Sequence, residues 1–415
     1  MSFHTYNEYK NTGVEWLGKL PAHWDVFPLK AGFNLMKRPP PEDCGVVTAF
    51  RDGEVTLRSN RRMDGFTEAF QEIGYQGVEP NDLVIHAMDA FAGAIGVSDS
   101  KGKSTPVYSV CEPKKDYFSR YYGLVLRHIA LAGFIQSLAK GIRERSTDFR
   151  WSDAKNIPVP HPSIQEQKTI IDFLDYEAGK IDRLVAEQVT LIELLKEKRQ
   201  AVISNAVTKG LDPKVEMKDS EVEWLGKVPK HWDVVPLKYF VSMKSGEQIT
   251  SEQIREEGAF PVYGGNGLRG YFEKYTHDGD YPLIGRQGAL CGNINYASGK
   301  FWASEHAVVV APQKKTNIFY IGELLRSMNL GQYSTSAAQP GLSVEAIGNL
   351  RIPAPAIDEQ NQIANYLMIE AGKWESLIEA ATRSISLFQE RRSALISAVV
   401  TGQIDVRNYQ TKEVQ

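Results

Sequence analysis

The strongest constraint on this fold is that the chain contains one segment twice. Residues 14–30, VEWLGKLPAHWDVFPLK, return as residues 222–238, VEWLGKVPKHWDVVPLK, with substitutions only at Leu20/Val228, Ala22/Lys230 and Phe27/Val235. Internal repeats set the architecture of a chain and are therefore considered first. The stretches that follow the two copies, about 31–155 and 239–350, diverge strongly. Duplicated segments that flank divergent stretches indicate one scaffold that presents two different recognition surfaces.

A second duplicated stretch predicts two long helices. Ile-Pro-Val-Pro at 157–160 with Glu166-Gln167 recurs as Ile-Pro-Ala-Pro at 352–355 with Glu359-Gln360. The prolines exclude a helix there, and the spacing from Ser163 to Glu166 is that of a capping box. Beyond these starts, apolar residues alternate four and three apart, as in a coiled-coil seam. The seam residues are Leu174, Ala178, Ile181, Val185, Ile192 and Leu195, then Leu367, Ala371, Trp374, Ile378, Ile385 and Phe388.

The repeats predict a mixed α/β (α+β) fold with an internal pseudo-twofold. Two similar globular domains are expected, joined by two long helices that form an antiparallel coiled coil, because each seam needs a partner. Two amphipathic helices packed on their own domains are the alternative. The expected segments are 1–158 and 213–353 for the domains, 159–212 and 354–406 for the helices, and 407–415 for a tail. Within the first domain, a helix is expected from Tyr121 to Leu138.

Composition narrows the class of protein. The chain has 415 residues, which suits several domains, and a net charge of −3. Its three cysteines are far apart, so neither a disulfide framework nor a zinc site is expected. No signal pattern or membrane-spanning run is visible, and a cytoplasmic location is therefore predicted. If a chain of this charge binds DNA, it should do so weakly when alone, or together with a basic partner that supplies phosphate contacts.

Two glycine-rich motifs suggest nucleotide binding only superficially. Gly102-Lys103-Ser104 has Val97 where a phosphate-binding loop requires glycine, so a turn between strands is expected. Gly265, Gly267 and Gly270 match a dinucleotide spacing, but no strand–helix–strand pattern follows. The stretch is equally consistent with a plain hairpin and with a nucleic-acid contact loop.

The predicted contact residues lie in the divergent stretches. Arginine pairs well with guanine, and asparagine or glutamine with adenine, although plain solvated surface is as good an interpretation for any single residue. The candidates are Arg58, Asn60, Arg61, Arg62, Arg143, Arg145 and Arg150, then Asn266, Arg269, Lys274, Arg286, Gln287 and Gln339. No catalytic or metal-ligand pattern is visible, and the duplicated His23 and His231 are expected to serve packing.

The duplicated Glu-Trp-Leu-Gly…Pro-x-His-Trp segments and the Ile-Pro-x-Pro…Glu-Gln helix starts resemble the specificity (S) subunits of Type I restriction-modification systems. The resemblance covers nearly the whole chain. It implies a non-catalytic protein with two target recognition domains, each reading half of a gapped double-stranded DNA sequence. It also implies docking of methyltransferase (M) subunits, expected to be two, and of restriction (R) subunits. S-adenosylmethionine, ATP and Mg²⁺ would be bound by these partners and not by this chain.

Two other classes of function stay open. A coiled-coil scaffold that never reads DNA would explain the repeated frame, but not why the domains diverged within one chain. A nucleotide-dependent enzyme is a third reading, and it would require a bound nucleotide.

Overall fold

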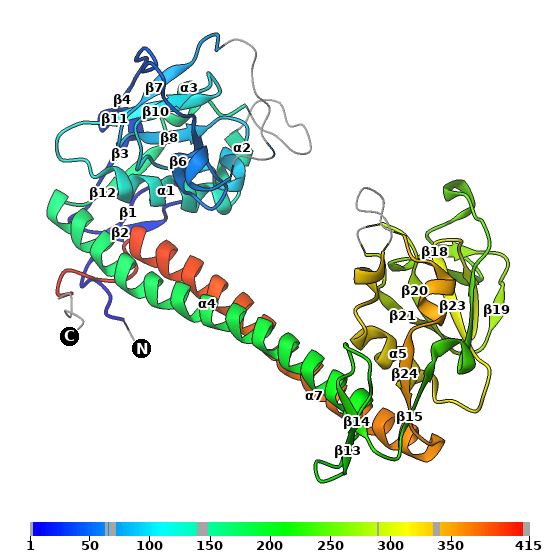
Figure 1. Cartoon of the computed structure of the whole chain (residues 1–415). Helices are drawn as coiled ribbons and strands as arrows, with labels where there is room; N and C mark the ends of the chain where they lie inside the picture. Colours follow the sequence, from blue (N-terminus) through cyan, green and yellow to red (C-terminus); the bar gives the residue numbers. More distant parts are fainter. Residues whose placement is uncertain are drawn as a thin grey trace. The chain divides into compact units, whose positions relative to one another are not determined.

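The computed structural model describes residues 3–62, 65, 72–138, 148–288, 290–334 and 341–409. The chain forms two compact units. Unit 1 comprises Met1–Glu187 and Ser384–Gln415, and unit 2 comprises Gln188–Arg383. The long helices α4 (Ile164–Lys209) and α7 (Ile357–Val400) each contribute one part to each unit (Figure 1).

Unit 1 is a mixed α/β domain built on short strands. Its four-stranded sheet has the order β4-β11-β8-β9, and α1 packs on β9 and β8 (Figure 1). The apolar run Leu83-Val84-Ile85 is fully buried in the sheet, which explains its strand. Besides parts of α4 and α7, the helices and strands of unit 1 are β1 (Tyr9–Asn11), β2 (Lys19–Pro21), β3 (Asp25–Pro28), β4 (Phe33–Leu35), β5 (Val47–Ala49), β6 (Val55–Leu57), β7 (Gln76–Val78), β8 (Leu83–His86), β9 (Ile95–Val97), β10 (Gly102–Ser104), β11 (Tyr108–Pro113), α1 (Ser119–Leu131), α2 (Phe134–Leu138), α3 (Trp151–Ala154) and β12 (Pro158–His161).

Unit 2 repeats this plan. Its sheet order β16-β23-β20-β21 matches that of unit 1, and α5 packs on β20 and β21. A further sheet, β18-β17-β22-β19, is present in this unit. The elements are β13 (Met217–Asp219), β14 (Lys227–Pro229), β15 (Asp233–Pro236), β16 (Val241–Ser245), β17 (Phe260–Gly264), β18 (Gly267–Phe272), β19 (His277–Asp278), β20 (Tyr281–Gly285), β21 (Ile294–Ala297), β22 (Lys300–Ala303), β23 (Ala307–Pro312), α5 (Ile318–Ser327), α6 (Val344–Gly348) and β24 (Arg351–Ala354).

The long helices run antiparallel within each unit. In unit 1, Arg392 Nε of α7 lies 2.8 Å from Asp182 Oδ1 of α4, and Leu174, Ile181 and Leu395 share one core. In unit 2, Ile203 and Leu367 share the core, and the Lys198 ammonium lies 5.7 Å from the Trp374 ring. All twelve seam residues predicted from sequence are buried or half-buried. The predicted fold class, two similar mixed α/β domains with paired long helices, is confirmed.

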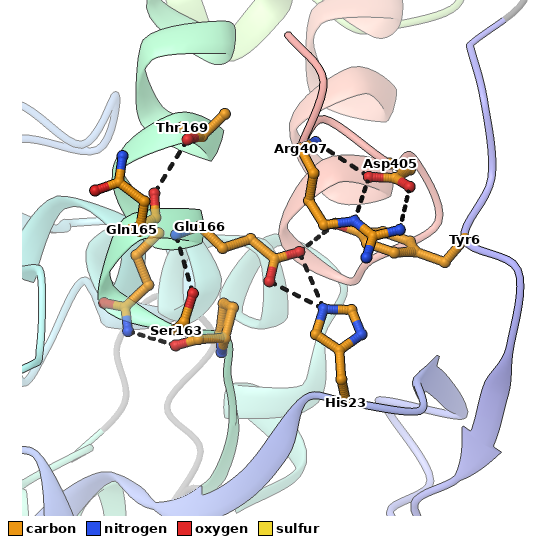
Figure 2. Close-up of polar contacts among 10 residues, drawn as sticks. Tyr6, His23, Ser163, Gln165, Glu166, Thr169, Asp405 and Arg407 are labelled. Atoms are coloured by element: carbon orange, nitrogen blue, oxygen red, sulfur yellow. Dashed lines mark hydrogen bonds and ion pairs between the residues drawn. The ribbon is translucent and has the colours of Figure 1, made fainter.

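The repeated His-Trp segments brace the starts of the long helices. Ser163 Oγ accepts the Glu166 amide at 3.3 Å, but the Glu166 carboxylate does not close a capping box. It accepts the Tyr6 hydroxyl at 2.8 Å and lies 3.0 Å from His23 Nε2 (Figure 2). The Glu166 contact, together with burial, raises the pKa of Tyr6 well above its usual value, so its hydroxyl keeps its proton and donates.

The second copy of the brace uses the same residues slightly differently. His231 Nε2 lies 3.0 Å from Glu359 Oε2, and Trp232 Nε1 donates to the same oxygen at 2.8 Å. Trp24 Nε1, by contrast, is buried without a hydrogen-bond partner. The expectation that His23 and His231 serve packing agrees with these contacts.

The duplicated glutamines tie each long helix to the neighbouring short helix. Gln167 accepts the backbone amide of Phe118, the N-cap of α1, at 2.8 Å and donates to Pro162 O. Gln360 accepts the amide of Asn317, the N-cap of α5, at 3.0 Å and donates to Pro355 O. Both glutamines are buried, so the repeated glutamine positions each globular domain on its own pair of helix segments.

Two local expectations were wrong. The helix expected from Tyr121 to Leu138 is divided into α1 and α2, because Gly133 has φ +82° and its amide bonds back to Ala130 O. Gly102-Lys103-Ser104 forms strand β10, paired with β7, and not a turn. The stretch from Tyr263 to Tyr271 is the β17–β18 hairpin.

Candidate nucleic-acid interface

In unit 1 three of the predicted arginines, Arg58, Arg61 and Arg62, gather in a cleft of about 770 Å³ between the β5–β6 hairpin and the ends of the central strands β8 and β11. Arg58 Nε donates to Thr48 Oγ1 at 3.1 Å, which orients the guanidinium in the cleft. Arg61 forms ion pairs with Asp52 and with Glu54, and its guanidinium lies 4.3 Å from the Phe50 ring centre. Arg62 lines the same cleft. Held guanidiniums beside an aromatic ring suit contact with a base edge or a phosphate.

The back of this cleft is polar and was missed by sequence reasoning. The His86 ring lies against the Tyr108 ring, tilted by 53° with ring centres 4.6 Å apart, and its Nδ1 accepts the Asp89 amide at 2.9 Å. Burial lowers the pKa of His86 despite the neighbouring Asp89, whose carboxylate oxygen lies 3.2 Å from the same Nδ1. Arg51 pairs with Asp89 at 2.7 Å. These residues are not part of the arginine cluster in the sequence, and it is the packing of strands β5, β8 and β11 that brings them to the same cleft.

The other unit 1 candidates lie elsewhere. Asn60 donates to Thr56 Oγ1 at 2.9 Å and does not line the cleft. Arg150 caps α3, bonds Asp148 at 2.7 Å and lines a separate groove of about 1290 Å³ with Lys37, Lys155 and Trp151. Arg143 and Arg145 lie outside the described residues, as does Gln339 of the second domain. The unit 1 cluster is therefore narrower than the sequence grouping.

In unit 2 glycines bring two candidate loops into contact. The tip of the β17–β18 hairpin carries the exposed Asn266. A Cβ on Gly285, the residue before Arg286, would stand only 2.3 Å from Gly265 O, so the tip lies directly against the end of β20. Glycine at both positions permits this close approach. Asn266, Arg286 and Gln287 are consequently neighbours on one edge of unit 2.

Backbone and side-chain contacts hold this edge in place. Arg286 is half-buried and its Nη1 donates to Ser245 Oγ at 3.2 Å, while its backbone amide bonds His306 O at 2.9 Å. Gln287 is exposed and forms an isolated β-bridge with Gly341. Asn266 and Gln287 present exposed amides and Arg286 a guanidinium, which are the groups that read adenine and guanine edges.

Two unit 2 candidates depart from this edge. Arg269 lies across Gly264, where an added Cβ would meet Arg269 Cδ at 2.5 Å, so it follows the hairpin surface. Lys274 lies beyond the far end of β18, at the opposite end of the strand from Asn266. The structure therefore separates Lys274 from the group with which sequence placed it.

The described part of the chain contains no group of three or more His, Cys, Asp or Glu side chains that could hold a metal ion. Among the described residues, no helix combines the length and apolar character needed to cross a membrane.

Comparisons with known proteins show which proteins the chain is similar to. Residues 229–369 match the family model described as Type I restriction modification DNA specificity domain. The chain is 35% identical over 227 residues to the Type I restriction enzyme EcoprrI specificity subunit of Escherichia coli, covering 54% of this chain and 52% of that protein. This chain thus spans about half of that relative's length.

More distant relatives extend over nearly the whole chain. The Type I restriction enzyme MjaVIII specificity subunit of Methanocaldococcus jannaschii is 24% identical over 423 residues, covering 94% of this chain and 95% of that protein. A solved structure described as the structural basis of complex assembly and conformational transition of the type I R-M system superposes with a TM-score of 0.69 at 14% identity, covering 93% of this chain and 99% of its own. The resemblance drawn from the duplicated segments is confirmed.

Proposed function

We propose that this chain is the DNA sequence-recognition subunit of a Type I restriction-modification system, in which each unit reads one half of a gapped double-stranded target. The observation that carries the proposal is the contrast between the two copies. The bracing residues Trp24/Trp232, Glu166/Glu359 and Gln167/Gln360 are duplicated, whereas the arginine cleft of unit 1 and the amide-and-arginine edge of unit 2 are unlike.

The chain itself carries out no catalytic step in this proposal. Its residues bind and orient DNA, through guanidinium groups held by Thr48 and Ser245 and through exposed amide groups, and the partner subunits perform methylation and cleavage. S-adenosylmethionine, ATP and Mg²⁺ belong to those partners. A scaffold without DNA readout would have no use for the preorganised polar cleft of unit 1 and the different polar edge of unit 2.

Duplicated exposed leucines support two methyltransferase partners. Leu184 and Leu377 occupy equivalent seam-relative positions on α4 and α7 and are 40% and 51% exposed. Leu194 and Leu387 form a second equivalent pair, at 56% and 58% exposed. Each unit therefore presents one leucine of each pair on its helix segments. A partner that recognises one copy should recognise the other, which supports a ratio of two partners to one chain.

Methylome sequencing tests the function. Cells that express this chain with its neighbouring methyltransferase should carry N6-methyladenine in a split, gapped motif that disappears when the chain is deleted. An unchanged methylome, with the methyltransferase expressed and active, would refute DNA recognition and favour a scaffold.

An exchange of residues 31–155 for the corresponding domain of a relative tests modularity. Only one half of the motif should change, because the braces at Glu166 and Gln167 come from outside the exchanged segment. A matched pair of variants refines the assignment: Arg286→Ala should relax the preference at one base pair, whereas Lys274→Ala should leave the motif unchanged. If both halves changed on domain exchange, the two-reader proposal would fail.

A further inference from the structure

The two copies of the internal repeat differ in whether an apolar site near the start of the long helix is covered. Each long helix carries an apolar pair near its start, one turn apart: Phe173 and Tyr176 on α4, and the equivalent Tyr366 and Ile369 on α7. In unit 1, Phe173 is 4% exposed, whereas in unit 2 Tyr366 is 38% and Ile369 is 63% exposed. The same site is therefore covered in one unit and open in the other.

Unit 1 shows what covers the site. The ring of Tyr409 lies 5.0 Å from Phe173 and 6.1 Å from Tyr176, and the Phe3 ring lies 5.5 Å from Phe173. The two terminal segments are joined by the Asp405 amide, which donates to His4 O at 2.8 Å. Residues 3–6 and 404–409 thus form an irregular terminal strap that places aromatic side chains on α4, and Val406 is buried beneath it.

Unit 2 has no equivalent cover among its described residues. After α4 the chain turns at Gly210 and continues through Leu211, which is 42% exposed, towards β13. A groove of about 640 Å³ remains, formed by Ala201, Val202 and Asn205 of α4, the Gly210-Leu211 turn and Tyr366 of α7. Leu211 corresponds to Ile404, which is packed against the unit 1 core. The open groove thus has an apolar floor of Ala201, Val202, Ala206, Leu211 and Tyr366, with Lys198 and Asn205 at its polar side, and no aromatic ring of the described residues covers it.

We propose that this unit 2 groove is the docking site for an aromatic residue in an extended segment of the partner methyltransferase, which takes the place that Tyr409 and Phe3 occupy in unit 1. The inference rests on the proposed function, which supplies the partner. Large rigid aromatic side chains that enter preformed pockets are the usual anchors of such interfaces. One consequence is that the two partner copies bind unequally, because the chain's own strap occupies the equivalent site in unit 1.

Hydroxyl-radical footprinting of the full chain, with and without the purified cognate methyltransferase, tests the proposal without any substitution. Tyr366 and Ile369 should lose reactivity in the complex, while the covered Phe173 and Tyr409 should change little. If the complex forms and Tyr366 and Ile369 keep their full reactivity, the groove proposal is overturned and the proposed function stands. If no complex forms, both fall. Protection that depends on the concentration of the chain alone would assign the groove to a second copy and refute the partner assignment.

A variant pair tests the energetics. Tyr366→Ala combined with Ile369→Ser should raise the dissociation constant for the methyltransferase about tenfold or more, since anchor truncations exceed that value. Tyr366→Phe should keep the affinity, because the wall of the groove needs only the ring of this residue. Leu131→Ser, at a 57% exposed position at the end of α1, is the matched control. Equal affinities for the double variant and the control would contradict the proposal. Circular dichroism that matches the wild type excludes misfolding as the cause.

Discussion

A buried tyrosine in each unit caps the end of a long helix. Tyr121 of α1 donates its hydroxyl to Val400 O at 3.1 Å, and Tyr320 of α5 donates to Val207 O at 3.2 Å. Both carbonyls lie in the last turn of their helices, where no intrahelical amide reaches them. Both side chains are fully buried, which raises their pKa values far above the usual range and keeps the hydroxyls protonated.

The substitutions Tyr121→Phe and Tyr320→Phe therefore test this cap. Each removes one oxygen and leaves a buried carbonyl without its partner, which destabilises by about 1–3 kcal/mol. Tyr320 Oη also lies 3.4 Å from Pro353 O, so its single proton is shared between two carbonyls and the same range applies to its loss. For units of this size, a loss of about 1.5 kcal/mol lowers Tm by roughly 3–6 °C.

Hydrogen exchange followed by mass spectrometry locates the effect. Tyr121→Phe should speed exchange in the last turn of α7 by about tenfold, and Tyr320→Phe should do so in the last turn of α4, because 1.4 kcal/mol corresponds to a factor of ten. Tyr239→Phe, at a 55% exposed position, is the control and should change neither. If each variant loosened both helix ends equally, or neither, the assignment of one cap to each unit would be refuted.

Three further predictions follow from buried or open positions. Arg38→Met should destabilise unit 1 by about 3 kcal/mol in calorimetry, because it leaves the buried Asp82 without its ion pair. Arg120→Ala, which breaks the exposed ion pair with Asp175, should lower the free energy of unfolding by under about 1 kcal/mol, and equal losses in the two variants would contradict the argument. Burial lowers the pKa of His128 and of His161 below the ordinary 6.5, so on acidification these histidines take up a proton in the unfolded chain before they do so in the folded chain. Unit 1 should therefore lose stability as pH falls through about 6.5, and His128→Gln should reduce this loss in pH-dependent melting curves. Gly179→Ala and Gly372→Ala, at equivalent helical positions with nothing within 4 Å of an added Cβ, should each raise stability by up to about 1 kcal/mol in thermal melts, and a loss would show a contact at that face.

The repeated frame was predictable because its signals are local and duplicated. Proline residues before Ser163 fix where α4 begins, and the heptad spacing fixes which face is buried, so both long helices follow from sequence. The division of the Tyr121–Leu138 helix was missed because a single glycine inside an apolar pattern is usually tolerated. Here the positive φ of Gly133 ends α1.

The recognition surfaces were only partly predictable. Arg58, Arg61 and Arg62 are neighbours in sequence and share one cleft, so a local cluster was enough to find them. His86 and Tyr108 complete that cleft from two other strands, and no spacing in the sequence connects them to the arginines. Lys274 was grouped with Asn266 on proximity in sequence, but an extended strand of about 3.3 Å per residue carries it away from the hairpin tip.

The braces and the reading surfaces occupy separate parts of each unit, and this separation explains the pattern of the sequence. Glu166, Gln167 and Tyr121 bind helix ends in unit 1, and Glu359, Gln360 and Tyr320 do the same in unit 2. The cleft of unit 1 and the polar edge of unit 2 rest instead on the β5–β6 and β17–β18 hairpins, which share none of these hydrogen bonds. Substitutions in the hairpins can therefore change what is read without loosening the domain from its helices. A brace must keep its buried donors and acceptors matched, and so its glutamate, glutamine and tyrosine recur in both copies while the hairpins diverge.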